Sequence, residues 1–240
     1  NQNGNLFIAW CWKAGGAAVL NEDGTIDSQV SANVDAGFSI VSYTGASANQ
    51  NVGHGLDETP QLIIVKNRDT AGNGWATQSP FSGGAYYHMM LNLTQEAKNN
   101  VNWIWNDTEP TSSVFSIGEN GITNTSGNKY IGYCFHSVDF YQKVGSYTGG
   151  GSNLTVINVG FAPTMVLFKC TSNAGSTWRI FDTVRGTDKS ITVNSSLAEY
   201  DDATNYVDFT STGFEFNRSV TQANPDINGS GRTYIYLAIA

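Results

Sequence analysis

The sequence predicts an all-β protein, built as two tandem antiparallel β-sandwich, or jelly-roll-like, domains related by an internal duplication. Three observations predict this class. Short apolar or alternating stretches are separated by turn residues along the whole chain. Charged residues make up only 13% of the composition, too few for the outer faces of long helices. The second half also repeats the order of motifs found in the first half, which indicates two copies of one unit.

The duplication is visible in motifs that recur in a fixed order. The string Ser42-Tyr43-Thr44-Gly45 returns 104 positions later as Ser146-Tyr147-Thr148-Gly149. The apolar run at residues 62–66 follows Pro60, and the run at 165–169 follows Pro163 in the same way. Further matched pairs are Trp75 with Trp178, Gly121-Ile122 with Gly213-Phe214, and residues 130–135 with 234–239. These anchors define two domains, at residues 37–138 and 139–240.

Residues 1–36 precede the first domain and form an N-terminal strand and a connector. A strand is predicted at residues 6–12, and its part 8–12 resembles the closing strands of both repeats. Two interpretations stay open: it is the last strand of an earlier repeat whose body is missing, or it pairs into the first domain. Within the connector, residues 21–25 predict a tight turn between two short extended pieces.

Strands of the first domain are predicted at residues 38–43, 62–66, 114–117 and 130–135, with another short strand beginning at Trp75. The continuous apolar run 62–66 is typical of a strand covered on both faces. Asn120-Gly121 predicts a hairpin turn. Residues 91–98 are the one stretch with a helical pattern, which Asn92 or Thr94 would cap. Strands of the second domain are predicted at residues 144–147, 165–170, 178–182, 206–209, 214–217 and 233–239.

The charge and cysteine content exclude several functional classes. Twelve Lys and Arg residues stand against twenty Asp and Glu, which gives a net charge of −8. This balance argues against nucleic acid and against anionic membranes as partners. No stretch reaches the roughly 20 apolar residues of a membrane helix, so no membrane insertion is expected. The three cysteines are far apart and are interpreted as small buried side chains: Cys11, Cys134 and Cys170.

Motifs for catalysis, cofactors or metals are not found, so we expect no enzyme, no cofactor and no metal site. The three histidines fall in different elements without metal-ligand spacing: His54, His88 and His136. Glycosidase-like carboxylate pairs, Asp57 with Glu58 or Asp182 with Asp188, are interpreted as solvated loop acids. Residues 21–24 and 224–229 resemble oxygen-rich calcium loops but lack the full ligand spacing, so they are interpreted as turns.

Aromatic residues in the insertion of the first repeat are the candidate ligand-binding side chains. Trp103 and Trp105 are two positions apart and would point to the same side of a strand, with Ile104 opposite. Indole and phenol rings stack on the apolar faces of sugars. The predicted contact residues are Trp103, Tyr86 and His88. The alternative is that the insertion packs its own aromatics, including Tyr87, against the sandwich.

Several strings resemble those of a known family. They are Ala9-Trp10-Cys11-Trp12-Lys13-Ala14-Gly15-Gly16, residues 36–45, Gly53-His54-Gly55-Leu56 with Pro60, and residues 143–149 with Gly160-Phe161-Ala162-Pro163. The chain is similar to an uncharacterised repeated β-domain in virion proteins of tailed bacteriophages, often marine ones. The resemblance covers nearly the whole chain, departs at Cys11 and at residues 78–84, and carries no catalytic residues with it.

The resemblance implies a non-enzymatic virion module, with a tail-fibre or receptor-binding role that attaches the particle to a host surface glycan or protein. The expected partners are other virion proteins and further copies of the chain, in an extracellular particle assembled in the host cytoplasm. A purely architectural virion domain, used for capsid decoration or as a spacer, is the alternative. A glycan depolymerase ranks last, because it would need a facing carboxylate pair.

Overall fold

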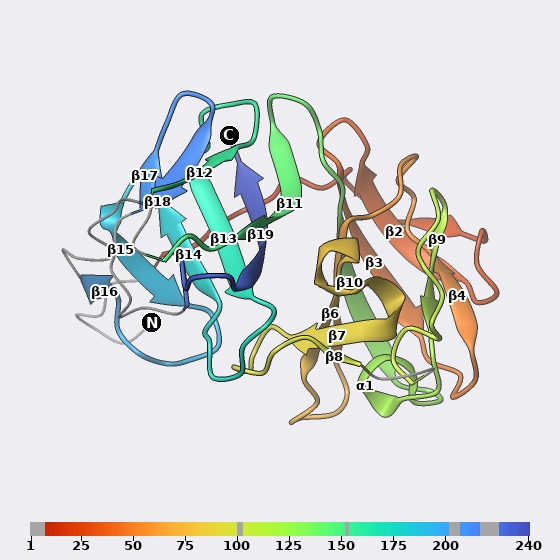
Figure 1. The fold of residues 1–240 in the computed structure, drawn as a ribbon. Coiled ribbons are helices and arrows are strands. Elements are labelled where there is room, and N and C mark those ends of the chain that lie inside the picture. Colours follow the sequence, from red (N-terminus) through yellow and green to blue (C-terminus); the bar gives the residue numbers. More distant parts are fainter. Residues whose placement is uncertain (1–7, 100–102, 152–153, 202–206, 217–225) are drawn as a thin grey trace, which may run out of the picture.

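The computed structural model describes residues 8–99, 103–151, 154–201, 207–216 and 226–240 (Figure 1). Strands make up 43% of the protein and helices 5%, which confirms the predicted all-β class. The sheets are antiparallel throughout, apart from an isolated parallel bridge between Ile26 and Val52. None of the helices in the described part of the chain has the length and hydropathy of a membrane span.

The first half is a sandwich of one large and one small sheet. The large sheet has the order β1-β2-β3-β10-β5-β6-β7-β8, and the small sheet pairs β4 with β9. Side chains of both sheets meet in one core, for example Val65 and Tyr130 with Val52 and Phe115. The strands are β1 Val19–Asn21, β2 Ser28–Asn33, β3 Phe38–Thr44, β4 Gln50–Gly53, β5 Leu62–Asn67, β6 Trp75–Gln78, β7 Tyr87–Met90, β8 Lys98–Asn99, β9 Val114–Ile117 and β10 Lys129–Phe135.

The second half is also a sandwich, with a six-stranded sheet ordered β11-β19-β13-β14-β15-β16 and a three-stranded sheet ordered β12-β18-β17. Its core joins Phe168 and Tyr234 of the large sheet to Phe214 and Phe216 of the small one. The strands are β11 Gln142–Thr148, β12 Thr155–Asn158, β13 Met165–Cys170, β14 Arg179–Asp182, β15 Gly186–Thr192, β16 Tyr200–Asp201, β17 Val207–Phe209, β18 Gly213–Phe216 and β19 Thr233–Ile239. The order β3-β10-β5-β6-β7 of the first half thus has a counterpart in β11-β19-β13-β14-β15.

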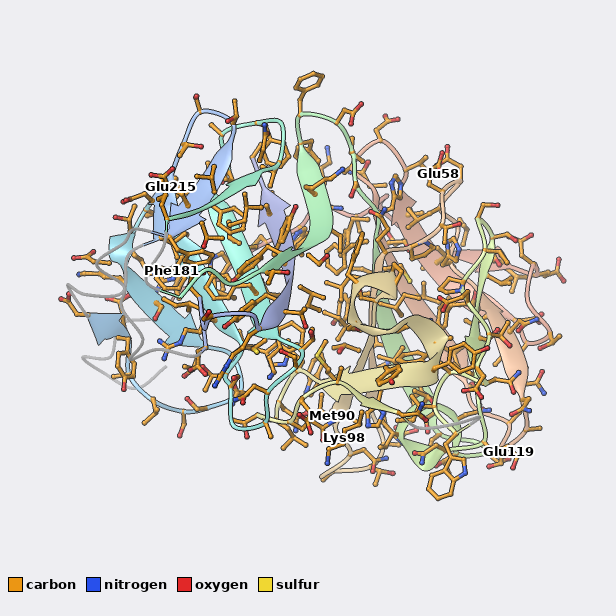
Figure 2. The ribbon with its side chains drawn as sticks, in the orientation of Figure 1. Glu58, Met90, Lys98, Glu119, Phe181 and Glu215 are labelled. Carbon is orange, nitrogen blue, oxygen red and sulfur yellow. The ribbon has the colours of Figure 1, made fainter. Side chains whose placement is uncertain are left out.

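A third core lies between the two large sheets, which face each other in the middle of the molecule (Figures 1 and 2). Successive side chains of a strand point to opposite faces of a sheet. In β5, Ile63 and Val65 therefore enter the core of the first sandwich, whereas Leu62 and Ile64 enter the central core. The apolar run at residues 62–66 is thus covered on both faces, as its composition predicts.

Stacked tyrosines occupy corresponding places in the two sandwiches. Tyr43 stacks on Tyr130 with 5.1 Å between ring centroids, and Tyr147 stacks on Tyr234 at 4.7 Å. The Tyr43 hydroxyl donates to the Thr123 carbonyl at 2.8 Å, and the Tyr147 hydroxyl donates to the Ile227 carbonyl at 2.6 Å. Burial raises the pKa of both Tyr43 and Tyr147. These side chains are structural, which agrees with their recurrence in the sequence.

In each half, a buried asparagine comes directly after the residue whose carbonyl accepts the tyrosine hydroxyl. Asn124 accepts the Ala46 N–H at 2.7 Å and donates to the Ala48 carbonyl and, at 2.8 Å, to the Gly118 carbonyl. Asn228 accepts the Gly150 N–H at 2.9 Å and donates to the Gly151 carbonyl at 3.1 Å. Asn124 therefore ties the loop after β3 to the segment before β10, and Asn228 ties the loop after β11 to the segment before β19.

Replacing Asn124 with alanine is expected to lower the free energy of unfolding by about 2–3 kcal/mol, because buried backbone groups would lose their partners. Asn228→Ala is expected to cost a similar amount. Chemical denaturation of both variants would measure this. A loss below about 0.5 kcal/mol in either variant would show that its amide does not hold the loop.

The N-terminal segment contradicts the predicted strand at residues 6–12. Residues 8–12 form no strand, and residues 6 and 7 lie outside the described part. The segment crosses between the halves instead: Trp12 lies 6.1 Å from Phe135 of the first half, and the Arg185 guanidinium lies 5.5 Å from the Trp10 ring. Packing of the Trp10 and Trp12 indoles between the two halves thus takes the place of strand pairing in this segment.

Cys11 is exposed, which corrects its expected burial, whereas Cys134 and Cys170 are buried.

Other local expectations were also wrong. Residues 91–98 form no helix, because the chain turns at 91–93 and continues extended into β8. The Asn120-Gly121 pair makes no hairpin: the Asn120 side chain accepts the Ile122 N–H and caps the short helix α1, Gly121–Asn124. Gly121 therefore does not correspond to Gly213, which begins strand β18. An Asn-Gly pair can either begin a helix, with the Asn side chain as its N-cap, or form the turn of a β-hairpin, and the backbone N–H groups can serve only one of these structures.

Candidate functional site

Trp103 is the most prominent exposed aromatic of the insertion in the first half. Its side chain is 68% exposed, whereas Ile104 is 3% exposed and Trp105 is fully buried in the first core. Residues 103–105 form a bend, so the prediction that Trp103 and Trp105 share one face of a strand was wrong. The bend allows both Ile104 and Trp105 to reach the core, and Trp103 is left at the surface.

The backbone around Trp103 is fixed by the turn before α1. The Asn120 N–H donates to the Trp103 carbonyl at 2.9 Å, and the Gly118 N–H donates to the Ile104 carbonyl at 2.8 Å. The Thr123 hydroxyl also donates to the Ile104 carbonyl, at 3.1 Å. The indole of Trp103 is therefore carried by a backbone that is held from both sides, by core burial and by hydrogen bonds. Such preorganisation lowers the entropy cost of binding.

An open hollow of about 700 Å³ lies beside the indole. This volume is in the usual range for small-molecule sites, roughly 300–1,000 Å³. Within the described part of the chain, the side chains of Asn49, Asn106 and Glu119 make no hydrogen bond or ion pair. Figure 2 labels Glu119 at the end of the first half that carries α1. The lining residues are Asn49, Trp103, Asn106, Glu119, Asn120 and Gly121.

Asn106 and its neighbour Asp107 adopt left-handed backbone conformations, with φ of 51° and 43°. Asn and Asp tolerate this region better than other residues with side chains. The Thr108 N–H donates to the Trp105 carbonyl at 3.2 Å, which closes the turn. The turn brings Asn106 to the rim of the hollow, three positions after the indole.

The other two predicted contact residues are not among those that line this hollow. Tyr86 is 51% exposed and ends the 3-10 turn Gly84–Tyr86. His88 lies in β7, where it pairs with Lys98 of β8 and is half-buried. Burial lowers the pKa of His88, and the nearby Lys98 charge lowers it further, against an opposing hydrogen bond to the Lys98 backbone. The structure therefore does not bring Tyr86 and His88 into the lining of the Trp103 hollow.

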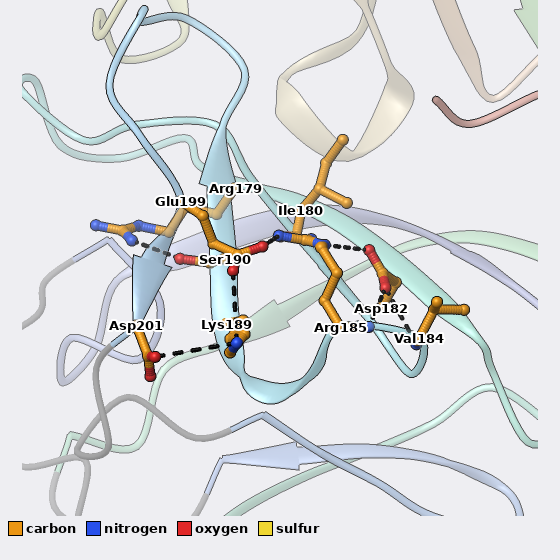
Figure 3. A network of polar contacts seen from close by, with 9 residues as sticks. All are labelled: Arg179, Ile180, Asp182, Val184, Arg185, Lys189, Ser190, Glu199 and Asp201. Carbon is orange, nitrogen blue, oxygen red and sulfur yellow. Dashed lines mark hydrogen bonds and ion pairs between the residues drawn. The ribbon is translucent and has the colours of Figure 1, made fainter. Parts of the chain in front are cut away.

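His54 and, among the candidate carboxylates, Asp182 have structural partners. His54 is fully buried, its Nδ1 accepts the Leu56 N–H at 3.2 Å, and burial lowers its pKa. Asp182 accepts the backbone N–H groups of Val184 and Arg185 and pairs with the Arg185 guanidinium at 2.7 Å (Figure 3). Arg185 also pairs with Glu199 at 3.0 Å, so Asp182 belongs to an ion-pair network. In the described ranges, His, Cys, Asp and Glu form no group of three that could hold a metal ion.

A second hollow, of about 420 Å³, gathers acidic residues that the sequence does not place together. Asp57 and Glu58 are adjacent in the chain, but Asp35 and Asp139 reach the same surface from other loops. His136 also lines it, is 7% exposed, and contacts the Ser137 carbonyl through Nδ1 at 2.9 Å. Sequence reasoning found only the adjacent pair, because the other acids converge through the tertiary fold.

Comparisons with known proteins identify the family of this chain. No curated protein and no solved structure matches the chain significantly. A family model described as a domain of unknown function, DUF7483, matches residues 1–240. The chain therefore belongs to the DUF7483 family.

Proposed function

We propose that this protein is a non-enzymatic adhesion module of a phage virion, of the tail-fibre or receptor-binding kind, and that it binds a host surface glycan at the Trp103 hollow. The observation that carries the proposal is an indole 68% exposed on a backbone anchored by buried neighbours. The virion assignment rests on the sequence strings that resemble repeated β-domains of tailed-phage proteins. Under this assignment, the protein forms homo-oligomers, contacts other virion proteins and is located in an extracellular particle.

The chemistry of the hollow suits a sugar. An exposed indole offers a flat apolar face for the C–H face of a pyranose ring. Amide and carboxylate groups of Asn49, Asn106 and Glu119 lie beside it and can exchange hydrogen bonds with hydroxyl groups. Exposing a tryptophan to water costs free energy, and a ligand that covers it recovers part of that cost.

We also propose that the two sandwiches, at residues 37–138 and 139–240, are copies of one duplicated unit, preceded by the segment 1–36. The support comes from side chains with the same role at the same spacing. Tyr43, Asn124 and Tyr130 of the first half have counterparts 104 positions later. Trp103 has no counterpart in this set, which favours a function for the insertion beyond the shared scaffold.

Replacing Trp103 with alanine is expected to weaken glycan binding by about 10- to 100-fold, as for an aromatic contact at the centre of a site. The free energy of unfolding should change by no more than about 0.5 kcal/mol, because the side chain is largely exposed. Glycan-array binding followed by calorimetry on the bound glycans measures both the specificity and the affinity.

Tyr86→Ala is the matched control, because Tyr86 is an exposed aromatic outside the hollow. Binding retained by Tyr86→Ala and lost by Trp103→Ala would support the hollow as the site. Equal weakening by both would extend the contact surface to Tyr86 and His88, as the sequence predicts. Glycan binding that is unchanged in Trp103→Ala would remove the assignment.

A purely architectural virion domain without a ligand is the second candidate. The burial of Trp105 and the partial burial of Tyr87 favour it, because these insertion aromatics pack against the protein itself. A chain of this kind would bind no glycan and would still assemble with other virion proteins. A depolymerase remains the last candidate, and release of reducing sugars from host polysaccharide would be its signature.

A further inference from the structure

We infer that the Trp103 hollow takes uncharged sugars, such as neutral hexoses and N-acetylhexosamines, and discriminates against sialylated, uronic, sulfated or phosphorylated glycans. The inference rests on the proposed function and specifies the class of glycan. It follows from the charge and the hydrogen-bonding groups that surround the indole.

The hollow has one formal charge along its described lining, the negative charge of Glu119. The other polar side chains are the neutral amides of Asn49, Asn106 and Asn120, and no Lys or Arg of the described chain lines the site. Residues 100–102, whose structure is not described, are Asn-Val-Asn and bring no charge. Recognition of an anionic group ordinarily requires Arg, Lys or a helix N-terminus with free N–H groups.

The short helix α1 begins beside the hollow but offers little to an anion. The Asn120 side chain accepts the Ile122 N–H, and the Asn124 N–H and the Thr123 N–H donate to the Asn120 carbonyl. These N–H groups of the first turn are therefore already satisfied within the protein. The net charge of −8 adds a general repulsion toward anionic ligands.

The Glu119 carboxylate is suited to neutral sugars. An ionised carboxylate is purely a hydrogen-bond acceptor, and its two oxygens match two adjacent hydroxyl groups. Glu119 is exposed and unpaired within the described chain, so a ligand would not have to break an existing ion pair to bind it. Hydrogen bonds to charged groups are stronger than those between neutral groups, which makes Glu119 the expected polar anchor beside the Trp103 ring.

The experiment is an array of neutral hexose and N-acetylhexosamine oligosaccharides, each paired with its sialylated, sulfated or uronic acid derivative. We expect the protein to bind members of the neutral set and to bind their anionic partners at least tenfold more weakly. Glu119→Gln should weaken neutral binding about tenfold and narrow the gap between paired glycans. Glu119→Lys should reverse the preference. Glu58→Gln, an exposed acid in the other hollow, is the control and should leave the profile unchanged.

The outcomes separate the two levels of the proposal. Binding that depends on Trp103 but favours the anionic glycans would overturn the inferred class and leave the adhesion function standing. Equal responses of Glu119→Gln and Glu58→Gln would show that net charge rather than the Glu119 carboxylate sets the preference, and would overturn the role of Glu119. No binding to any glycan on the array would overturn the proposed function itself.

Discussion

We expect that replacing Trp178 with alanine lowers the free energy of unfolding by about 3–5 kcal/mol, the cost of removing a large buried aromatic. Trp178 is 1% exposed and lies in the central core between the two large sheets. Its indole N–H donates to the Met90 carbonyl of the first half at 3.0 Å. The variant would leave a cavity at the junction, and the Met90 carbonyl would keep only its bond from the Leu93 N–H, so both halves would lose support.

The corresponding residue of the first half provides the control. Trp75 is half-buried at the edge of the same core, and its ring stacks on Tyr133 with 6.5 Å between the ring centroids. Trp75→Ala should cost clearly less than Trp178→Ala in urea denaturation, because less apolar surface is buried there. The loss of unfolding free energy in Trp178→Phe should lie between those of Trp75→Ala and Trp178→Ala. Phenylalanine keeps most of the side-chain volume but cannot donate the indole hydrogen bond. Equal losses of unfolding free energy in Trp75→Ala and Trp178→Ala would contradict the conclusion that Trp178 supports the central core more than Trp75 does.

Replacing Lys169 with methionine is expected to stabilise the protein by up to about 3 kcal/mol at neutral pH. Lys169 is fully buried in β13, and its ammonium donates to the Cys170 carbonyl at 2.9 Å. Burial lowers the pKa of Lys169 from 10.5 to about 8, against opposing contributions from Cys170, Asp226 and Glu96. Methionine would fill a similar volume and remove a buried charge that costs solvation free energy.

The pH dependence gives the same prediction a second measurement. Between about pH 8 and 10.5 the unfolded chain holds a proton on Lys169 that the folded protein has lost. Stability therefore rises with pH across this window, because the unfolded state binds more protons. From about pH 9 the buried Cys134 thiol works in the opposite direction, because burial raises its pKa from 9.0 to about 12 and it ionises first in the unfolded state. Near pH 10 and above, the raised pKa values of Tyr43 and Tyr147 add to this loss of stability. The rise should therefore be clearest between about pH 7.5 and 8.5.

Urea denaturation at several pH values between about 7 and 8.5 tests this. The native protein should gain stability over this range, and Lys169→Met should show little change. Lys66→Met is the control, because Lys66 is the sequence counterpart in the first half but is only half-buried and donates to the Asn73 carbonyl. A Lys169→Met variant that keeps the full rise with pH would show that other groups cause it.

Strongly patterned strands could be predicted from the sequence. Predicted residues 114–117 coincide with β9, residues 165–170 with β13 and residues 233–239 with β19. Strands with little apolar character were missed, such as β4, in which Val52 is the only large apolar residue. Its neighbours are polar, so its pairing with β9 depends on the partner rather than on its own pattern.

The candidate site was predicted in part. The position of Trp103 in an insertion marks it as a candidate, but the sequence does not distinguish it from Trp105. Two tryptophans two positions apart look alike until the backbone bends and the first core takes Trp105. Asn49 and Glu119 come from distant parts of the chain, so no local pattern could place them beside the indole.

The all-β class, the recurring tyrosines and the small number of basic residues can be read from the amino-acid sequence, because they follow from composition, from local periodicity and from the repeated motifs. The three-dimensional fold was needed to show that the two large sheets share a core, that residues 8–12 cross the junction and which insertion aromatics face water. Those outcomes depend on contacts between residues far apart in the chain. The interior holds only part of the apolar side chains, so which of them are buried depends on how the whole chain packs.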